Sequence, residues 1–158
     1  MAYIGRSLGD GERIVGLAHF HWWYTVNAWL ALIVPVALLI VAENVADPDL
    51  HQSAVIGALA LLIIGVIVFL RLMIRKWTTE IGITSHRFVK KTGFVSLHTD
   101  EIALPNIEGV EVHQSVWGRI WGYGWLKIEG TGVDAIRLPT IADPIGFRRA
   151  IETAKGMK

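Results

Sequence analysis

The sequence lacks cysteine altogether and is poor in charged residues. Without cysteine, the chain forms no disulfides, binds no metal through thiolates and offers no cysteine nucleophile. Only 18% of its residues are Asp, Glu, Lys or Arg, whereas soluble domains average about 25%. Because 53% of the residues are hydrophobic as well, the composition indicates that part of the chain lies in lipid.

Motifs of the common enzyme classes are missing too, including the P-loop, the dinucleotide-binding fingerprint and H-E-x-x-H. Acidic residues are scattered along the chain, without an evident catalytic carboxylate pair. His19 and His21 would suit a metal on a strand, but on a helix the two rings point apart, and interfacial histidines are the better interpretation. We therefore expect no enzyme activity, metal or cofactor. The net charge of +1 gives no reason to expect a nucleic-acid partner.

Two long stretches contain no charged residue. Residues 22–42 read WWYTVNAWLALIVPVALLIVA, and a helix of that length crosses a hydrocarbon core of about 30 Å. Residues 54–70 form the second stretch, which extends to about residue 74 if Arg71 reaches the interface. Neither has the polar face of a helix at the surface of a soluble protein. The sequence predicts a transmembrane hairpin over residues 22–76, the alternative being a buried hairpin in a soluble protein.

The distribution of cations predicts the orientation of this hairpin. The loop at residues 43–53 contains acidic residues and no Lys or Arg, whereas Arg6 and Arg13 precede the first span. Since Lys and Arg near spans stay cytoplasmic, we expect a multi-pass protein of the inner (plasma) membrane with both termini cytoplasmic. The expected anchors at the inner interface are aromatic or basic: Trp22, Trp23, Tyr24, Arg71, Arg75 and Lys76.

Within the spans, two residues stand out from the apolar background. Pro35 removes one backbone hydrogen bond and is expected to kink the first span. Asn27 lies about one turn inside, where it either hydrogen-bonds a neighbouring helix or reaches interfacial water. As the interior of the spans offers little polar surface besides Asn27, two such helices make a poor conduit, which argues against a transporter subunit.

After Lys76, short β-rich segments alternate with turn residues. Asp143 and Pro144 have the pattern of a helix N-cap followed by proline at the first helical position. About 80 residues suffice for one small core. We expect an α+β architecture in which a curved antiparallel sheet of six or seven strands, at residues 77–158, is capped by a C-terminal helix. Residues 1–21 are expected to form a separate cytoplasmic segment.

The individual elements of this domain follow from the same pattern. Strands are expected at residues 77–84, 87–94, 99–104, 107–114, 125–129 and 135–138, with a bulge at Gly109. The apolar stripe of the final helix is expected to comprise Ile145, Phe147, Ile151 and Ala154.

Two groups of residues are candidates for binding. Arg87, Lys90 and Lys91 lie on the second expected strand, where Arg87 and Lys91 share a face. Anionic lipid attracts each basic residue near its surface by about 1 kcal/mol. These residues form either a site for lipid phosphate or ordinary solvated charges.

The second candidate is the expected loop WGRIWGYG at residues 117–124. Aromatic residues interleaved with Gly and Arg are typical of interfaces, which points to Trp117, Arg119, Trp121 and Tyr123. Alternatively, Ile120 and Trp121 merely plug the end of the sheet.

Several loose motifs together resemble a known family. In chain order they are Gly11-Glu12, His21-Trp22, Thr84 and Arg87 in T-x-x-R, Gly93, the strand at 106–112, Gly118-Arg119 with Gly122 and Gly124, and D-P-x-x-F at 143–147. This order and spacing resembles the bacterial pleckstrin-homology-like (bacterial PH domain type 2) family of membrane-flanked domains. The resemblance implies a seven-stranded PH-like sheet with a C-terminal helix behind a membrane hairpin, and it implies little biochemistry.

Two functions fit these observations. The first is a membrane-anchored interaction or scaffold module that self-associates or binds another membrane protein, since tethering raises the effective concentration at the surface. The alternative is a module that senses anionic lipid headgroups through Arg87, Lys90 and Lys91.

Overall fold

The computed structural model describes residues 2–94 and 96–157 and divides the chain into two compact units. Met1–His21 and Trp77–Lys158 form the first unit, and Trp22–Lys76 form the second. The N-terminal segment, which was expected to stand apart, therefore belongs to the same unit as the C-terminal domain.

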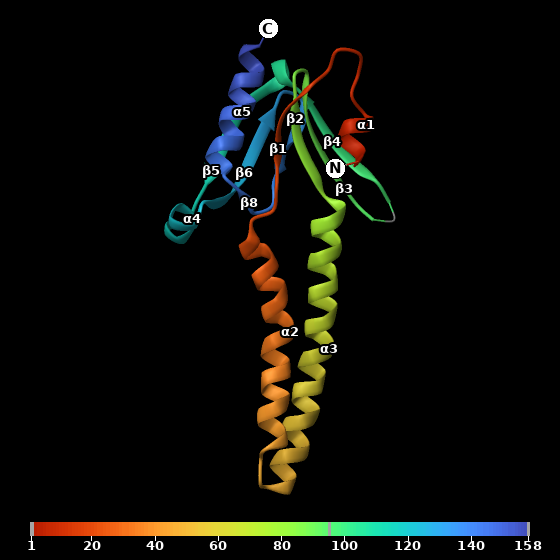
Figure 1. Ribbon diagram of the computed structural model, residues 1–158, viewed down its shortest axis with the longest axis vertical. Coiled ribbons are helices and arrows are strands. Elements are labelled where there is room, and N and C mark those ends of the chain that lie inside the picture. The colour runs from red at the N-terminus through yellow and green to blue at the C-terminus, as the bar shows by residue number, and fades with distance from the viewer. Residues whose placement is uncertain (1, 95, 158) are drawn as a thin grey trace. The chain divides into compact units, whose positions relative to one another are not determined.

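The second unit is a helical hairpin of α2 (Trp22–Glu43) and α3 (Pro48–Thr78) (Figure 1). Both helices are long and apolar enough to cross a membrane. The start of α3 was predicted too late, near residue 54. Asp47 Oδ1 accepts hydrogen bonds from the backbone N–H groups of Asp49 (3.0 Å) and Leu50 (3.1 Å). Asp47 therefore caps α3, and the connector between the helices is shorter than expected.

Small residues bring α2 and α3 close together. Gly65 is buried, and a Cβ atom there would collide with the carbonyl oxygen of Ala31. About one turn away, the Trp29 and Phe69 rings meet edge to face at 5.2 Å, and further along Lys76 Nζ donates to Thr25 Oγ1 at 2.6 Å. α2 runs through Pro35 as one helix.

Eight strands of the first unit, among the described residues, form two antiparallel four-stranded sheets. The first sheet has the order β1-β2-β3-β4, and in the second β6 pairs with β5, β7 and β8. The strands are β1 (Ile14–Ala18), β2 (Glu80–Thr84), β3 (Arg87–Thr92), β4 (His98–Ala103), β5 (Ile107–His113), β6 (Tyr123–Gly130), β7 (Val133–Arg137) and β8 (Ile141–Ala142). The predicted combination of antiparallel strands with a C-terminal helix is confirmed, but the strands form two sheets, and one strand comes from the N-terminal segment.

The core lies between the two sheets and α5 (Pro144–Gly156), which lies beside β1 (Figure 1). Asp143 caps α5 as predicted, because its Oδ1 accepts the N–H of Gly146 at 2.9 Å, and Pro144 follows in the first turn. The buried core residues are apolar: Ile81, Ile83, Phe88, Ile102, Leu104, Ile107, Leu126, Ile128, Ile136, Leu138, Ile141, Phe147, Ile151 and Ala154.

Two local predictions were wrong, and a third is confirmed. The strand predicted from Trp77 begins at Glu80, because α3 continues to Thr78 and helix propagation outweighs the β preference of Trp and Thr. Ile145 is 48% exposed, since two residues along a helix from Phe147 is the opposite face. The register shift between Ile107 and Gly109 matches the expected bulge.

The outer face of the first sheet is covered by the N-terminal segment. Ile4 of α1 (Ala2–Arg6) is buried, and together with Leu17 it lies over Gly82, where a Cβ would be 3.0 Å from Ile4 Cδ1 and 2.9 Å from Leu17 Cδ2. Val89, opposite Gly82 in the register, is buried as well. Two further short helices complete the unit: η1 (Leu104–Asn106) and α4 (Val116–Trp121).

Candidate interaction surfaces

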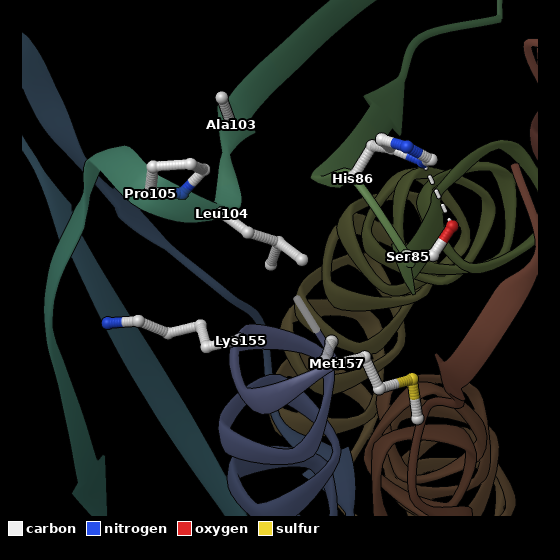
Figure 2. A pocket seen from close by; sticks show the side chains of 8 residues that line it. Ser85, His86, Ala103, Leu104, Pro105, Lys155 and Met157 are labelled. Carbon is white, nitrogen blue, oxygen red and sulfur yellow. Dashed lines mark hydrogen bonds between the residues drawn. The ribbon is translucent and has the colours of Figure 1, made fainter.

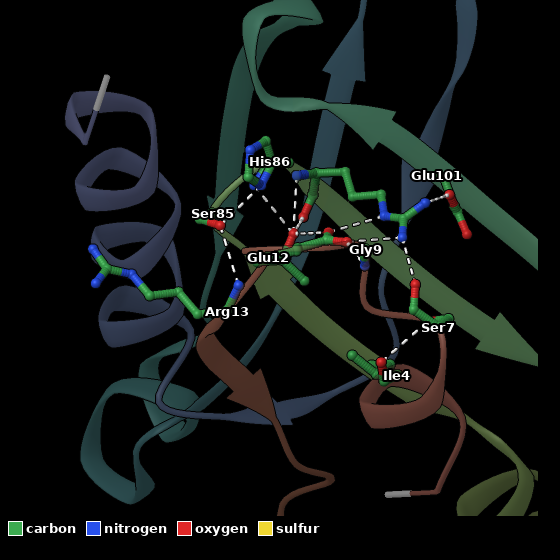
Figure 3. Close-up of polar contacts among 10 residues, drawn as sticks. Ile4, Ser7, Gly9, Glu12, Arg13, Ser85, His86 and Glu101 are labelled. Atoms are coloured by element: carbon green, nitrogen blue, oxygen red, sulfur yellow. Dashed lines mark hydrogen bonds and ion pairs between the residues drawn. The ribbon is translucent and has the colours of Figure 1, made fainter.

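Arg87, the first of the predicted lipid-phosphate residues, lies at the start of β3 and is bound by acidic and backbone acceptors. Its Nε and Nη2 donate to the two carboxylate oxygens of Glu12, each at 3.0 Å. Nη2 also donates to the carbonyl of Ser7 (2.7 Å), and Nη1 donates to Glu101 (2.9 Å). Figure 3 shows these acceptors gathered round one guanidinium. Because most of its donor capacity is engaged, Arg87 cross-links the N-terminal segment to the sheet and is a poor candidate for phosphate binding.

Glu12 is the centre of this network, which we call the Glu12 clasp. Its side chain is only 5% exposed, and besides Arg87 it accepts hydrogen bonds from the Gly9 N–H (2.7 Å) and the Thr84 hydroxyl (2.6 Å). Thr84 Oγ1 in turn accepts the N–H groups of His86 (3.2 Å) and Arg87 (3.0 Å), which shapes the β2–β3 turn. The clasp therefore joins two segments that lie far apart in the sequence.

The pKa of Glu12 reflects this environment. Burial by itself raises the pKa of the carboxyl group, but hydrogen bonds from Gly9, Thr84 and Arg87 and the charge of Arg87 outweigh it, so the pKa lies below its usual value. The pKa of Arg87 is raised, chiefly by its hydrogen bonds to Glu12. Both groups are therefore held in their charged forms.

The other two basic residues on β3 differ from each other. Lys90 Nζ lies 3.1 Å from Asp100 on the neighbouring strand β4, and its side chain is only 16% exposed. Lys91 lies opposite Glu80 and Thr99 in the register and is half-buried. Two of the three predicted residues are thus paired with carboxylates, which leaves little free positive charge for an anionic headgroup.

The second predicted group, around Trp117, lies largely on a short helix that the sequence reading treated as a loop. Ser115 caps α4 by accepting the N–H of Gly118 at 3.0 Å, and Gly122 ends it with a φ of 71°. Trp117 and Trp121 are exposed, as is Arg119, so they do not plug the sheet.

Tyr123, which begins β6, is half-buried and faces the N-terminal segment. Its ring lies 5.1 Å from that of the buried His21. On the same strand, Trp125 stacks on His113 at 4.0 Å, with the Arg137 guanidinium 5.7 Å from its ring centroid.

The predicted anchors are distributed between the ends of α2 and α3. Trp22 is exposed and meets Trp23 edge to face at 5.6 Å, and Tyr24 follows half-buried. Arg71 and Arg75 are exposed along the last turns of α3, whereas Lys76 is half-buried.

A cavity of about 590 Å³ opens beside the C-terminal end of α5 (Figure 2). Its polar lining comes from Ser85 and His86, whose Oγ and Nδ1 lie 2.9 Å apart, and from Lys155, whose Nζ donates to the carbonyl of Ile107 at 2.8 Å. The remaining lining is apolar, including Leu104 and Met157. No sequence pattern indicates this cavity, because its residues come from four separate elements or turns.

Comparison with known proteins identifies the family. The model of the bacterial PH domain family matches residues 14–154, which span both sheets, α5 and the helical hairpin. The chain therefore belongs to the bacterial PH domain family, as the motifs suggested.

One solved structure similar to this chain is a DUF1696 family protein with a pleckstrin-homology domain from Shewanella loihica PV-4. It is 14% identical, with a TM-score of 0.38 over 49% of this chain and 71% of that chain. The family assignment rests on the family model and not on this similarity. No curated protein matches the chain.

Proposed function

We propose that this protein is a membrane-anchored PH-like interaction module, in which the helical hairpin spans the bilayer and the first unit lies at its cytoplasmic face. The observation that carries the proposal is the exposure of the apolar side chains on α2 and α3. Eight of the large ones are 55–65% exposed: Ile33, Ile40, Val41, Leu50, Ile56, Ile63, Ile64 and Ile67.

Water is an unfavourable surrounding for such a surface. Each square ångström of apolar area left in water forgoes roughly 25 cal/mol, and soluble monomers seldom expose large contiguous apolar patches. In α5, by contrast, Phe147, Ile151 and Ala154 are buried against the core. A hydrocarbon solvent accounts for the difference, because side chains that face lipid need no protein cover.

Because the sequence contains no cysteine, a single introduced cysteine is the sole thiol of the protein, which makes the proposal simple to test. In whole cells, a membrane-impermeant maleimide is expected to label Ala46→Cys in the connector, and to label Glu152→Cys on α5 only after the cells are opened. Both residues are exposed, so accessibility to the reagent depends on the side of the membrane. Labelling of both positions from the same side would contradict a spanning hairpin.

Self-association is the interaction that the hairpin itself supports. Asn27 is exposed on α2, and its amide has no hydrogen-bond partner among residues 2–94 and 96–157. An amide facing lipid is stabilised by a polar group on another helix, worth roughly 0.6–2 kcal/mol. The Asn27 of a second copy is such a group.

The corresponding experiment measures energy transfer between differently labelled copies of the full chain in liposomes. Asn27→Leu is expected to reduce the transfer several-fold, whereas Ile56→Leu, at another exposed position of the hairpin, leaves it unchanged. Wild-type protein that shows no transfer as the protein-to-lipid ratio rises would rule out self-association through this helix.

A further inference from the structure

Strand register places both chain exits of the first unit at one end of it. Ala18, the last residue of β1, lies opposite Ile81 near the start of β2. Three residues carry the chain from β1 to Trp22 of α2, and α3 ends at Thr78, just before β2 begins at Glu80. We call this end of the unit the exit end.

The connection between β3 and β4 begins at the exit end. β3 runs antiparallel to β2 with Lys91 opposite Glu80, so β3 finishes where β2 starts. The connection that follows presents Phe94 and Leu97, which are 77% and 56% exposed.

α4 lies at the exit end as well, beside the other sheet. Phe20, close to the chain exit, forms a bridge with Ile141, which pairs with Gly124 near the start of β6. Since α4 directly precedes β6, it lies at the same end of the unit (Figure 1). The 5.1 Å approach of the His21 and Tyr123 rings gives the same placement.

Together the two segments form an apolar rim. Its members are 44–77% exposed: Phe94, Leu97, Val116, Trp117, Ile120 and Trp121. Residues 93–98 and 114–122 contain no Asp or Glu, whereas α4 carries Arg119. Tryptophan, aliphatic side chains and arginine without carboxylates are the composition of segments that lie in a membrane interface.

Specific contacts hold α4, which carries four of the six rim side chains, against β6. A Cβ on Gly118 would lie 2.6 Å from the Tyr123 carbonyl oxygen, so the helix packs closely on β6 at this point. Gln114 Nε2 donates to that same carbonyl at 3.1 Å, and Ser115 caps the helix. The apolar side chains of α4 are thus presented on a fixed support.

We infer that the apolar rim inserts into the lipid interface of the leaflet at which the chain exits. The β3–β4 connection and α4 then hold the first unit on the membrane, in addition to the hairpin that tethers it. This inference rests on the proposed function, because lipid surrounds the chain exits only if α2 and α3 span the bilayer. The cation at Arg119 suits anionic headgroups, and the six side chains suit the acyl boundary beneath them.

Single cysteines carrying an environment-sensitive fluorophore test the inference in the full chain reconstituted in nanodiscs. Labels at Phe94→Cys and Trp117→Cys are expected to emit at shorter wavelength and to be quenched by lipids with a nitroxide near the headgroup. A label at Thr131→Cys, exposed at the opposite end of β6, is expected to stay unquenched. Ile63→Cys, on the exposed face of α3, is tested with lipids that carry the nitroxide deep in the acyl chain and reports whether the hairpin itself is in lipid.

The four positions separate the possible failures. Quenching at residue 63 without quenching at 94 and 117 would overturn the docked rim and leave the anchor standing. Quenching at none of them would overturn the proposed function. Emission at shorter wavelength at 117 that lipid nitroxides do not quench would mean that another protein copy covers the rim, and the inference would be wrong.

Discussion

At the scale of single residues, the carboxylate of Glu12 holds the N-terminal segment to the β2–β3 hairpin. It is nearly buried, and it satisfies Gly9, Thr84 and Arg87 at once. Glu12, Thr84 and Arg87 all belong to the motifs by which the sequence resembles its family, and the structure shows that they meet in one contact. The sequence identified these residues but left Arg87 as either a ligand of lipid phosphate or a solvated charge, because an ion-pair partner 75 residues away leaves no local pattern.

Replacing Glu12 is therefore expected to weaken the first unit. Glu12→Gln keeps the shape but removes the charge, and leaves a partly buried guanidinium with an amide in place of a carboxylate. We expect a loss of about 2 kcal/mol in the free energy of unfolding, measured by urea titration of the full chain in micelles. Glu152→Gln is the control, since it breaks an exposed i,i+4 pair with Arg148 that is worth about 0.3–0.5 kcal/mol. Equal losses in the two variants would contradict the clasp.

The depressed pKa of Glu12 also sets the direction of a pH effect. A carboxyl group whose pKa is lower in the folded state stabilises that state fully above its unfolded pKa, at about 4.3. This contribution is lost as the pH falls through the lower, folded value. Wild-type protein should therefore lose stability relative to Glu12→Gln on acidification, and the difference between their unfolding free energies should shrink below pH 4 or so. A difference that stays constant with pH would show that Glu12 is not stabilised as an anion.

At the scale of elements, the same dipeptide begins two helices. Asp-Pro at residues 143–144 was recognised as an N-cap, but Asp-Pro at 47–48 was assigned to a polar loop because it lies in the acidic stretch between the two apolar runs. In both cases the Asp side chain accepts backbone N–H groups of the first turn. Ser115 and Gly122 likewise mark the two ends of α4 in the sequence. The stretch between them was predicted as a loop because it is rich in Gly and Trp.

Asp143 provides a sharp test of helix capping, because its φ of 46° is in the left-handed region. Asp143→Ala loses the 2.9 Å hydrogen bond to Gly146 and places a residue without a side-chain acceptor in a strained conformation. We expect a loss of roughly 1–2 kcal/mol in thermal unfolding followed by circular dichroism. Asp143→Asn should lie close to wild type, since Asn both caps helices and tolerates this conformation. If Asn were as damaging as Ala, capping would not be the role of Asp143.

The packing of α2 against α3 depends on the absence of a side chain at Gly65. Gly65→Ala directs a methyl group at the carbonyl oxygen of Ala31, so α2 and α3 must move apart, at a cost of roughly 1–3 kcal/mol. Gly57→Ala is a matched control on the same helix, because its Cβ would meet nothing within 4 Å. Unfolding of the hairpin in increasing fractions of SDS, followed by energy transfer between the two helices, should separate these variants. If the two variants unfolded at similar SDS fractions, the close approach of the helices at Gly65 would be unimportant for the stability of the hairpin.

At the scale of the whole molecule, the sequence indicated the apolar hairpin and the α+β domain, because each has its own periodicity. It did not indicate that residues 14–18 complete the first sheet. The β1 segment has too few apolar residues for its pattern to predict a strand: Ile14, Val15 and Leu17. Its partner β2 begins more than 60 residues later, beyond both helices. Local pattern carries no information about such a pairing, which depends on the Glu12 clasp and on the packing of Ile4 and Leu17 over Gly82.

This topology predicts how the first unit must be isolated. Residues 77–158 alone lack β1 and α1, leaving β2 with an unpaired edge and Val89 without its cover, so we expect no cooperative unfolding transition. Residues 1–21 joined to residues 77–158 by a short Gly-Ser linker should fold, because Ala18 and Ile81 are register partners and lie only about 5 Å apart between their Cα atoms. Trp117→Ser with Ile120→Ser would limit aggregation through the rim. The chemical-shift dispersion of the amide NMR signals shows whether each of the two chains is folded. A folded 77–158 fragment would show that the sheet does not need the N-terminal segment.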